Sequence, residues 1–265
     1  MYTFEEIRGN TPLVEQLRRS AASGRSSHAY LFLGGAGAGK RLIANTFAKA
    51  LQGEGEKRPC DSCKSCHAFN HGNHPDVIYF QPLKNGKTYT IEDVREQLLE
   101  TVDLKPFQYE KKIYIIEKAD TLNIQSQNAL LKTLEEPPAH VIFILATTDP
   151  QKVPATILSR VQRFDFRRIT TETIAQTLMG YLKEEGQQAT PEAVRYVAHL
   201  GDGSMRDSLS ILDQCLAFFS GEEVTLEKVL DIMGAVDKTI FFEMTDAPAQ
   251  RDAKGAKLTV GTRRQ

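Results

Sequence analysis

The chain has 265 residues, of which 41% are hydrophobic and 25% charged, and its formal net charge is -1. This composition is typical of a globular protein with one large domain or two modest ones, and it excludes disordered and collagen-like chains. The near-neutral charge also excludes a uniformly basic coat, so any nucleic-acid contact must come from a local patch or from an assembly.

The first half of the chain alternates strand and helix patterns. Residues 29–33 form a short apolar run, a glycine-rich loop follows, and apolar residues at helical spacing continue to Leu51. Residues 112–117 and 141–146 are apolar runs continuous enough for burial on both faces. Residues 126–136 between them have one apolar face. The alternation predicts an α/β fold with a parallel sheet covered on both sides.

After Phe166 the pattern changes to short helices. Apolar residues at helical spacing cover residues 171–185, 191–200 and 208–219. A fourth helix is predicted to run to Met233, with Thr225 as its capping residue. From Pro248 onward apolar residues thin out and basic residues accumulate, which predicts a disordered tail. The second half therefore predicts a small all-helical domain.

The glycine-rich loop has the G-x-x-x-x-G-K spacing of a phosphate-binding loop. Its glycines are Gly34, Gly37 and Gly39 among others, and Lys40 follows them. Glycines let backbone N–H groups turn toward one anion, the following helix presents its positive end, and the lysine reaches the outer phosphates. The pattern predicts ATP binding at this loop. The alternative is a glycine-rich turn that binds no ligand.

Two positions depart from the pattern that magnesium requires. The residue after the lysine should supply a Ser or Thr hydroxyl to Mg²⁺, and here it is Arg41, which cannot ligate a cation. At the end of the predicted strand 112–117, an acidic pair would hold Mg²⁺ and polarise water, but the chain reads Glu117 followed by Lys118. We predict impaired Mg²⁺ binding and weak or absent ATP hydrolysis by this chain alone.

A cluster of three cysteines predicts a structural zinc site. Cys60, Cys63 and Cys66 have the close spacing of zinc ligands, and the fourth ligand is open among His67, His71 and His74. Cys215 falls in a predicted helix and is expected to be a buried apolar residue. No apolar run approaches ~20 residues and the N-terminus lacks a signal peptide's apolar stretch, so we expect a reducing compartment, with neither secretion nor membrane spanning.

Motifs along most of the chain are shared with one known family. They are Phe4–Asn10, Ser27–Phe32, the glycine-rich loop, the cysteine cluster, His74–Asp76, Asn128–Pro138, Leu145–Pro150, Ile157–Arg160 and Gly201–Ser210. With these motifs in order, residues 1–246 resemble a bacterial DNA polymerase III clamp loader subunit of the AAA+ ATPases. The residues after Asp246 resemble nothing that we recognise.

The resemblance implies a domain organisation. It places an AAA+ α/β nucleotide domain at residues 1–166, a zinc-binding insertion at about 58–76, and a helical lid at 167–240. Family members also carry a C-terminal collar that joins five subunits into a ring. Residues 241–265 would be the start of that collar and a disordered tail, so we expect a chain that lacks its collar, and the sequence leaves open whether a truncated or frameshifted gene is the cause.

The resemblance also implies roles for single residues. Ser159-Arg160 resembles the motif that supplies an arginine finger to ATP in the neighbouring subunit, with Val161 in place of the motif's cysteine. Thr148 resembles the sensor 1 residue, and Arg206 resembles sensor 2, both near the outer phosphates. Without the resemblance, these would be a surface arginine, a turn residue and a charged residue at a helix start.

The resemblance leaves the subunit type open. Arg41, Glu117 and Lys118 are similar to the delta-prime subunit, whereas residues 201–237 are more similar to gamma/tau. We favour a cytoplasmic delta-prime-like subunit that assembles with other loader subunits in a hetero-pentamer and helps load the sliding clamp onto primed DNA. The alternatives are a gamma/tau-type motor, a freestanding P-loop phosphotransferase and a nonfunctional fragment. Polymerase (nucleotidyltransferase) activity would belong to the assembled holoenzyme, because this chain shows no polymerase site.

Overall fold

The computed structural model describes residues 3–55, 57–82 and 88–234. These residues form two compact units: residues 3–173 with 203–205 make up an α/β unit, and residues 174–202 with 206–234 make up a helical unit. The expectations for a tail and the start of a collar at residues 241–265 lie outside the described residues.

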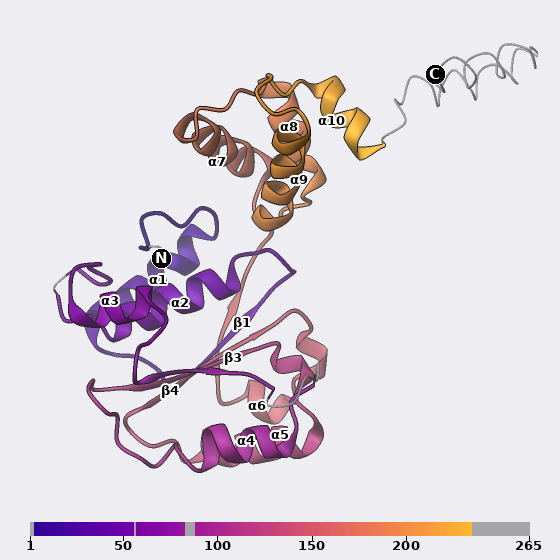
Figure 1. Cartoon of the computed structure of the whole chain (residues 1–265). Coiled ribbons are helices and arrows are strands. Elements are labelled where there is room, and N and C mark those ends of the chain that lie inside the picture. Colours follow the sequence, from indigo (N-terminus) through magenta and orange to yellow (C-terminus); the bar gives the residue numbers. More distant parts are fainter. Residues whose placement is uncertain (1–2, 56, 83–87, 235–265) are drawn as a thin grey trace, which may run out of the picture. The chain divides into compact units, whose positions relative to one another are not determined.

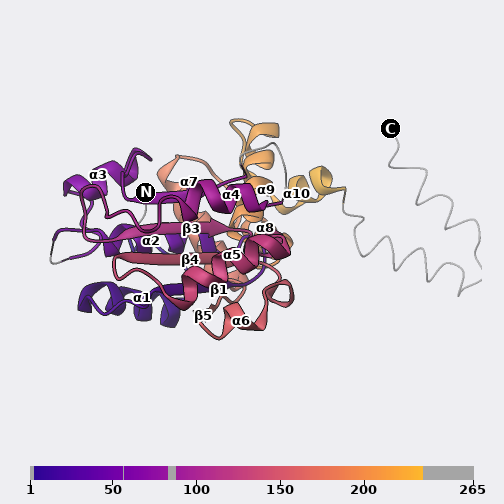
Figure 2. The ribbon, with the colours of Figure 1, turned by 90° about the horizontal axis from the view of Figure 1, so that it is seen from below.

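Five parallel strands form the sheet of the α/β unit, in the order β2-β3-β4-β1-β5. Figure 2 shows β3, β4, β1 and β5 side by side in this order. The predicted parallel sheet is confirmed, and β1, β3 and β4 match the three predicted strands to within one residue. The strands are β1 (Ala29–Leu33), β2 (Val77–Phe80), β3 (Lys112–Glu117), β4 (Val141–Thr147) and β5 (Gln162–Asp165).

Helices cover both faces of the sheet, as Figure 1 shows. One face carries α1 (Thr11–Ser23), α2 (Lys40–Leu51) and α3 (Lys64–Asn70). The other carries α4 (Ile91–Val94), extended by a π-helical turn, together with α5 (Ile124–Glu135) and α6 (Ala155–Leu158). Short 3₁₀ turns follow β3 and β4, at Ala119–Thr121 and Pro150–Lys152.

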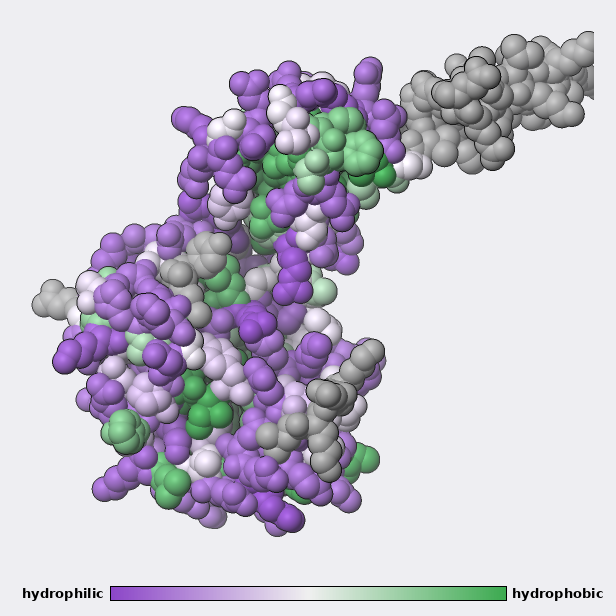
Figure 3. Space-filling model, viewed as in Figure 1, coloured by the Kyte–Doolittle hydropathy of each residue, from purple (hydrophilic) through white to green (hydrophobic). Residues whose placement is uncertain are grey.

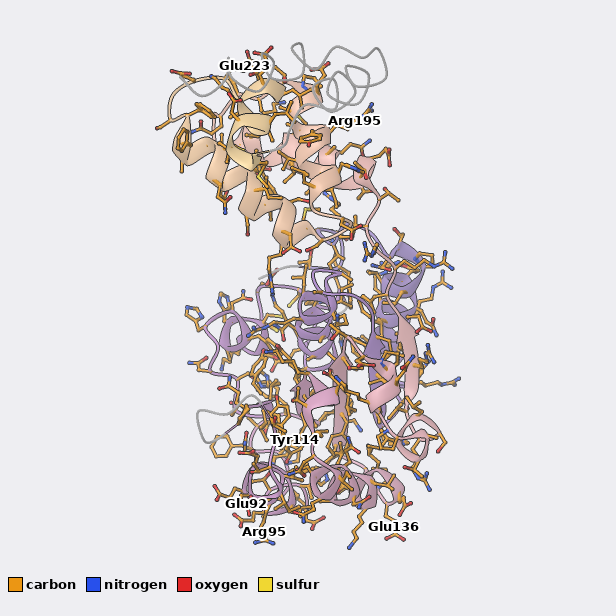
Figure 4. All side chains as sticks on the ribbon, turned by 90° about the vertical axis from the view of Figure 1, so that its right-hand side faces the viewer. Glu92, Arg95, Tyr114, Glu136, Arg195 and Glu223 are labelled. Carbon is orange, nitrogen blue, oxygen red and sulfur yellow. The ribbon has the colours of Figure 1, made fainter. Side chains whose placement is uncertain are left out.

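The strands separate two apolar cores because successive side chains of a strand point to opposite faces. In β1, Tyr30 and Phe32 pack with α1 and α2, whereas Leu31 and Leu33 pack with α5 and α6. Tyr114 of β3 is fully buried, and Figure 4 shows it inside the unit while Glu92, Arg95 and Glu136 lie at the outer surface. Burial on both faces explains the continuous apolar runs in the sequence.

Several elements were not predicted, and β5 shows why. Its sequence is Gln-Arg-Phe-Asp, and only Phe164 is buried. An edge strand pairs on one side and can carry exposed polar residues, so it has no apolar pattern. The other elements that the sequence did not indicate are α1, α3, β2 and α4.

The helical unit contains the four predicted helices. They are α7 (Thr171–Glu184), α8 (Pro191–Leu200), α9 (Met205–Phe218) and α10 (Leu226–Met233). Buried side chains from all four include Leu178, Val197, Leu212 and Val229. Thr225 stands at the N-cap of α10, as predicted, although its side chain makes no capping hydrogen bond.

On the side drawn in Figure 3, hydrophilic residues cover most of the α/β unit, whereas the helical unit shows a hydrophobic patch among its hydrophilic residues. In Figure 4, Arg195 and Glu223 lie at the surface of the helical unit. Large apolar side chains are exposed at a few places in the α/β unit, namely Leu99, Leu104, Phe107 and Ile124.

Candidate functional site

The predicted phosphate loop connects β1 to α2. Gly37 and Gly39 have φ angles of 71° and 86°, left-handed conformations that favour glycine. A Cβ at Gly37 would lie 1.7 Å from the Oγ of Ser204, and one at Gly34 would lie 2.8 Å from Phe166, so side chains are excluded at both positions. Gly39 is the N-cap of α2, and a Cβ there would meet no atom within 4 Å. The loop therefore presents the positive end of a helix to open space, which suits a phosphate group.

Lys40 folds back onto the loop. Its Nζ donates to the carbonyl oxygens of Gly34 and Gly35 at 2.6 and 2.7 Å. Burial lowers the pKa of Lys40, and the carboxylate of Asp120 acts in the opposite direction. The ammonium group is thus held at the loop, where a phosphate could replace the two carbonyl oxygens as its acceptor.

One departure from the magnesium pattern, Arg41, contacts the acidic residue that the pattern retains, Glu117. The Nε of Arg41, in the first turn of α2, lies 2.9 Å from the Oε1 of Glu117 at the end of β3. Lys118 is exposed and has a left-handed backbone conformation with φ 52°. Mg²⁺ needs oxygen ligands, but position 41 offers only nitrogen donors and the Glu117 carboxylate is engaged by a cation. Arg41 and Glu117 therefore do not fit a magnesium site.

The end of β4 contributes a residue that the sequence analysis missed. Thr147 is buried and lies opposite Leu33 of β1, whereas the predicted sensor Thr148 follows it and is exposed. The hydroxyl of Thr147 donates to Asp120 and accepts the N–H of Asp149 at 3.0 Å. Two features of the sequence could have indicated this contact: Thr147 ends an apolar run, and a second acidic residue, Asp120, follows shortly after Glu117.

The predicted arginine finger is held by an acidic residue of α5. Arg160 follows α6, and its Nη2 lies 2.9 Å from the Oε1 of Glu135. Its Nη1 donates to the carbonyl oxygen of Thr156 at 2.8 Å. In the helical unit, Arg206 lies in the first turn of α9 and is exposed.

The three cysteines lie together on the α/β unit. The sulfur atoms of Cys60, Cys63 and Cys66 all lie within 4.8 Å of one another, and the sulfurs of Cys60 and Cys66 are 3.9 Å apart. Zn–S bonds of ~2.3 Å in a tetrahedron place sulfurs about 3.8 Å apart, so this geometry fits three zinc ligands. Hydrogen bonding from Ser62 lowers the pKa of Cys60 to about 6, whereas burial raises the pKa of Cys66 to about 12.

None of the three histidines proposed as a fourth ligand belongs to this cluster, within the part of the chain that the structure describes. His74 is buried, with Nε2 3.2 Å from the Oγ of Ser65 and Nδ1 accepting the N–H of Asp76. His71 lies against the carbonyl oxygen of His67. Cys215 is buried in α9, as predicted.

The cysteine loop is fastened to the helix that follows the phosphate loop. Lys49 of α2 is fully buried, and its Nζ forms an ion pair with Asp61. The same ammonium donates to the Oδ1 of Asn70 at 2.8 Å. Helix α2 thus begins at the candidate nucleotide site and, through Lys49, contacts the loop that carries the candidate metal site.

Sequence comparisons identify relatives over nearly the whole chain. Residues 9–170 match the family described as "DNA polymerase III, delta subunit", and residues 173–221 match "DNA polymerase III clamp loader subunit, ATPase lid domain". DNA polymerase III subunit tau of Bacillus subtilis is 41% identical over 259 residues, which cover 97% of this chain and 45% of the relative. DNA polymerase III subunit gamma of Buchnera aphidicola is 34% identical over 257 residues, which cover 96% and 70%.

Tau of Escherichia coli is 37% identical over 95% of this chain and 39% of its own length, so this chain spans less than half of some relatives. In fold, the chain is similar to the RuvB branch migration motor of Thermotoga maritima, with a TM-score of 0.63 and 15% identity over 93% of this chain and 78% of RuvB. Among the described residues, the helices are too short or too polar to cross a membrane. The family matches and the relatives show that this chain belongs to the DNA polymerase III clamp loader subunits, with an AAA+ fold and a helical lid domain.

Proposed function

We propose that this chain acts within a bacterial clamp loader as a nucleotide-sensing subunit that hydrolyses little or no ATP by itself. Family membership supports the loader role. The observation that carries the low-hydrolysis part is the ion pair between Arg41 and Glu117, because it puts a guanidinium and an engaged carboxylate where the family pattern needs magnesium ligands. Its partners would be the other loader subunits in a hetero-pentamer, the sliding clamp, and primed DNA reached through phosphate contacts of the assembled ring.

The phosphate loop would hold the nucleotide in this proposal. Gly34, Gly37 and Gly39 give the loop its shape, and Lys40 supplies a positive charge. Thr148 and Arg206 would report the state of the outer phosphate to the two units. The hydrogen bond between Thr147 and Asp120 supports a sensing role for this end of β4, because it ties β4 to the segment after β3.

Arg160 would act on ATP bound in the neighbouring subunit. Its guanidinium is only partly exposed and already holds one carboxylate, that of Glu135. A phosphoryl group carries more negative charge than a carboxylate and can accept hydrogen bonds from the same planar set of guanidinium N–H groups. Arginine fingers contribute ~10³ to 10⁵ in rate, which would let a subunit with a poor site of its own take part in hydrolysis.

A second subunit type has specific support. The relatives are named tau or gamma, which favours a gamma/tau-type motor that hydrolyses ATP itself. The ion pair of Arg41 with Glu117 favours the non-hydrolysing type. ATP turnover by the purified chain in Mg²⁺ separates them: we expect none above background, and brisk Mg²⁺-dependent turnover would assign the motor type.

The loader role and the finger are tested in a reconstituted loader that contains this chain. We expect clamp loading onto primed DNA with the wild-type chain, and loss of at least about tenfold in the loader's ATPase rate with Arg160→Ala. Arg163→Ala is the matched control, because Arg163 is also ion-paired to a carboxylate, that of Asp165. Failure of the chain to enter the loader contradicts the proposed function. Equal ATPase rates for loaders with Arg160→Ala and with Arg163→Ala contradict the arginine-finger role of Arg160 but not the loader role of the chain.

A further inference from the structure

We infer that this chain binds nucleotide phosphates without a divalent cation, with Arg41 supplying the charge that Mg²⁺ supplies elsewhere. The inference rests on the proposed function to the extent that a nucleotide is placed at the phosphate loop. It goes further by specifying the ionic form of the ligand: the metal-free nucleoside di- or triphosphate.

The first argument is the position of two fixed positive charges. Lys40 and Arg41 are consecutive residues at the N-terminus of α2, where the helix itself favours an anion. A divalent ion normally adds two charges beside the lysine. Here the arginine adds one, and, unlike a bound ion, this charge does not depend on the metal concentration.

The second argument concerns Glu117. A bare carboxylate at the end of β3 would repel a polyphosphate unless a cation stood between them. Arg41 provides that cation, with Nε 2.9 Å from Oε1. A guanidinium carries five N–H donors in a planar fork, so holding Glu117 through Nε does not exhaust its capacity to donate to a phosphate oxygen.

The third argument is that the pair does not close the site. The Arg41 side chain is 63% exposed and that of Glu117 is 31% exposed. A guanidinium this exposed keeps its remaining N–H donors accessible from solvent while Nε holds Glu117. The loop beside them has open space at Gly35 and Gly39, where an added Cβ would meet no atom within 4 Å.

The test is calorimetric titration of ADP and ATP, as sodium salts, into the purified full chain. One buffer contains Mg²⁺, and the other has been freed of it on a chelating resin. The resin is preferable to a dissolved chelator, which would also compete for the metal predicted at Cys60, Cys63 and Cys66. We expect the two buffers to give the same dissociation constant to within about twofold.

Arg41→Thr restores a hydroxyl and releases Glu117. In this variant we expect binding to become at least about tenfold tighter in Mg²⁺ than in its absence. Arg19→Thr is the matched control: Arg19 also lies 2.9 Å from a carboxylate, that of Glu15, and the pair has side-chain exposures of 78% and 34%. It should bind as the wild-type chain does in both buffers.

Three results would overturn the inference. They are a wild-type affinity that rises tenfold or more on adding Mg²⁺, no binding by the wild-type chain in either buffer, and an Arg41→Thr variant as indifferent to Mg²⁺ as the wild type. Clamp loading by the reconstituted complex separates this failure from that of the proposed function. Normal loading with Mg²⁺-dependent binding rejects the inference alone, and metal-free binding without loader assembly rejects the proposed function alone.

Discussion

Lys49 and Asp61 form an ion pair in which the two partners differ sharply in exposure. The side chain of Lys49 is 1% exposed, and that of Asp61 is 35% exposed. The ammonium therefore depends on its partners for solvation, while the carboxylate can reach water. Because of this asymmetry, removing the charge of Asp61 should change the free energy of unfolding more than removing the charge of Lys49. The pair is the contact that joins α2 to the cysteine loop.

We predict that Asp61→Asn destabilises the protein more than Lys49→Met. Asparagine tolerates the left-handed backbone of residue 61, where φ is 54°, so the substitution mainly removes charge and leaves a buried ammonium with weaker partners. The expected cost is about 3 kcal/mol, against about 1 kcal/mol or less for the methionine variant, which removes the buried charge itself. Urea unfolding followed by far-ultraviolet circular dichroism measures both. A larger loss for Lys49→Met would refute this account.

Asp76 is predicted to hold the segment before β3. Its carboxylate is buried and accepts the backbone N–H groups of Phe107, Gln108 and Tyr109, the last two at 2.8 and 2.9 Å. Asp76→Asn turns part of this acceptor into a donor, so we expect a loss of about 1–3 kcal/mol in the free energy of unfolding. Amide exchange at residues 107–109 should accelerate far more than exchange in β1.

Asp165→Asn is the control for this substitution, because Asp165 is an exposed carboxylate of the same sheet. It should change stability by less than about 0.5 kcal/mol. Unchanged protection of residues 107–109 in Asp76→Asn would show that the three hydrogen bonds are not what orders that segment.

Metal binding is predicted to require each of the three clustered cysteines and to be independent of the fourth. Protein purified without chelators should contain about one zinc per chain, and Co²⁺ substitution should give the absorption of a thiolate-rich tetrahedral site. Serine at Cys60, Cys63 or Cys66 should abolish that spectrum. Cys215→Ser, which changes a buried cysteine of the helical unit, should retain it. Less than about half a zinc per wild-type chain would count against the site.

Stability is predicted to fall as the pH drops through the range of His74. This histidine is buried between the rings of Phe69 and Tyr109, with ring centroids 5.2 and 4.6 Å away, and burial lowers its pKa from 6.5 although Asp76 opposes the shift. In the unfolded chain the ring takes up a proton near pH 6.5, whereas in the folded protein it does so only at lower pH. The stabilisation is therefore present above about pH 6.5 and is lost as the pH falls.

Urea midpoints between about pH 7 and 5.5 test this dependence. His74→Gln should lower the midpoint at neutral pH, because it loses the contacts with Ser65 and Asp76, but it should flatten the pH dependence. His67→Gln changes an exposed histidine of α3 and should keep the wild-type slope. An unchanged slope in His74→Gln would assign the pH dependence to other groups.

The fold was accessible from sequence where burial is symmetrical. The strands β1, β3 and β4 are covered on both faces, so most of their side chains are apolar and the runs are easy to recognise. The edge strand β5 and the short helix α3 are set by contacts with their neighbours, and their own residues carry no clear period. The sequence placed Thr225 at the N-cap of α10 but could not show that its side chain makes no capping hydrogen bond, since residue type alone does not fix a side-chain rotamer.

The sequence by itself determined that this chain has a glycine-rich loop with the spacing of a phosphate-binding loop and arginine in place of the metal hydroxyl, a cluster of three cysteines, and helical periods in its second half. These follow from residue types at short spacings, where the local backbone decides geometry. Only the tertiary structure decided that Arg41 pairs with Glu117, that Thr147 rather than Thr148 is the buried threonine, and that no histidine among the described residues joins the cysteines. Such relationships depend on strand order, on which face a side chain takes, and on hydrogen bonds already made, and these arise only when distant segments pack together.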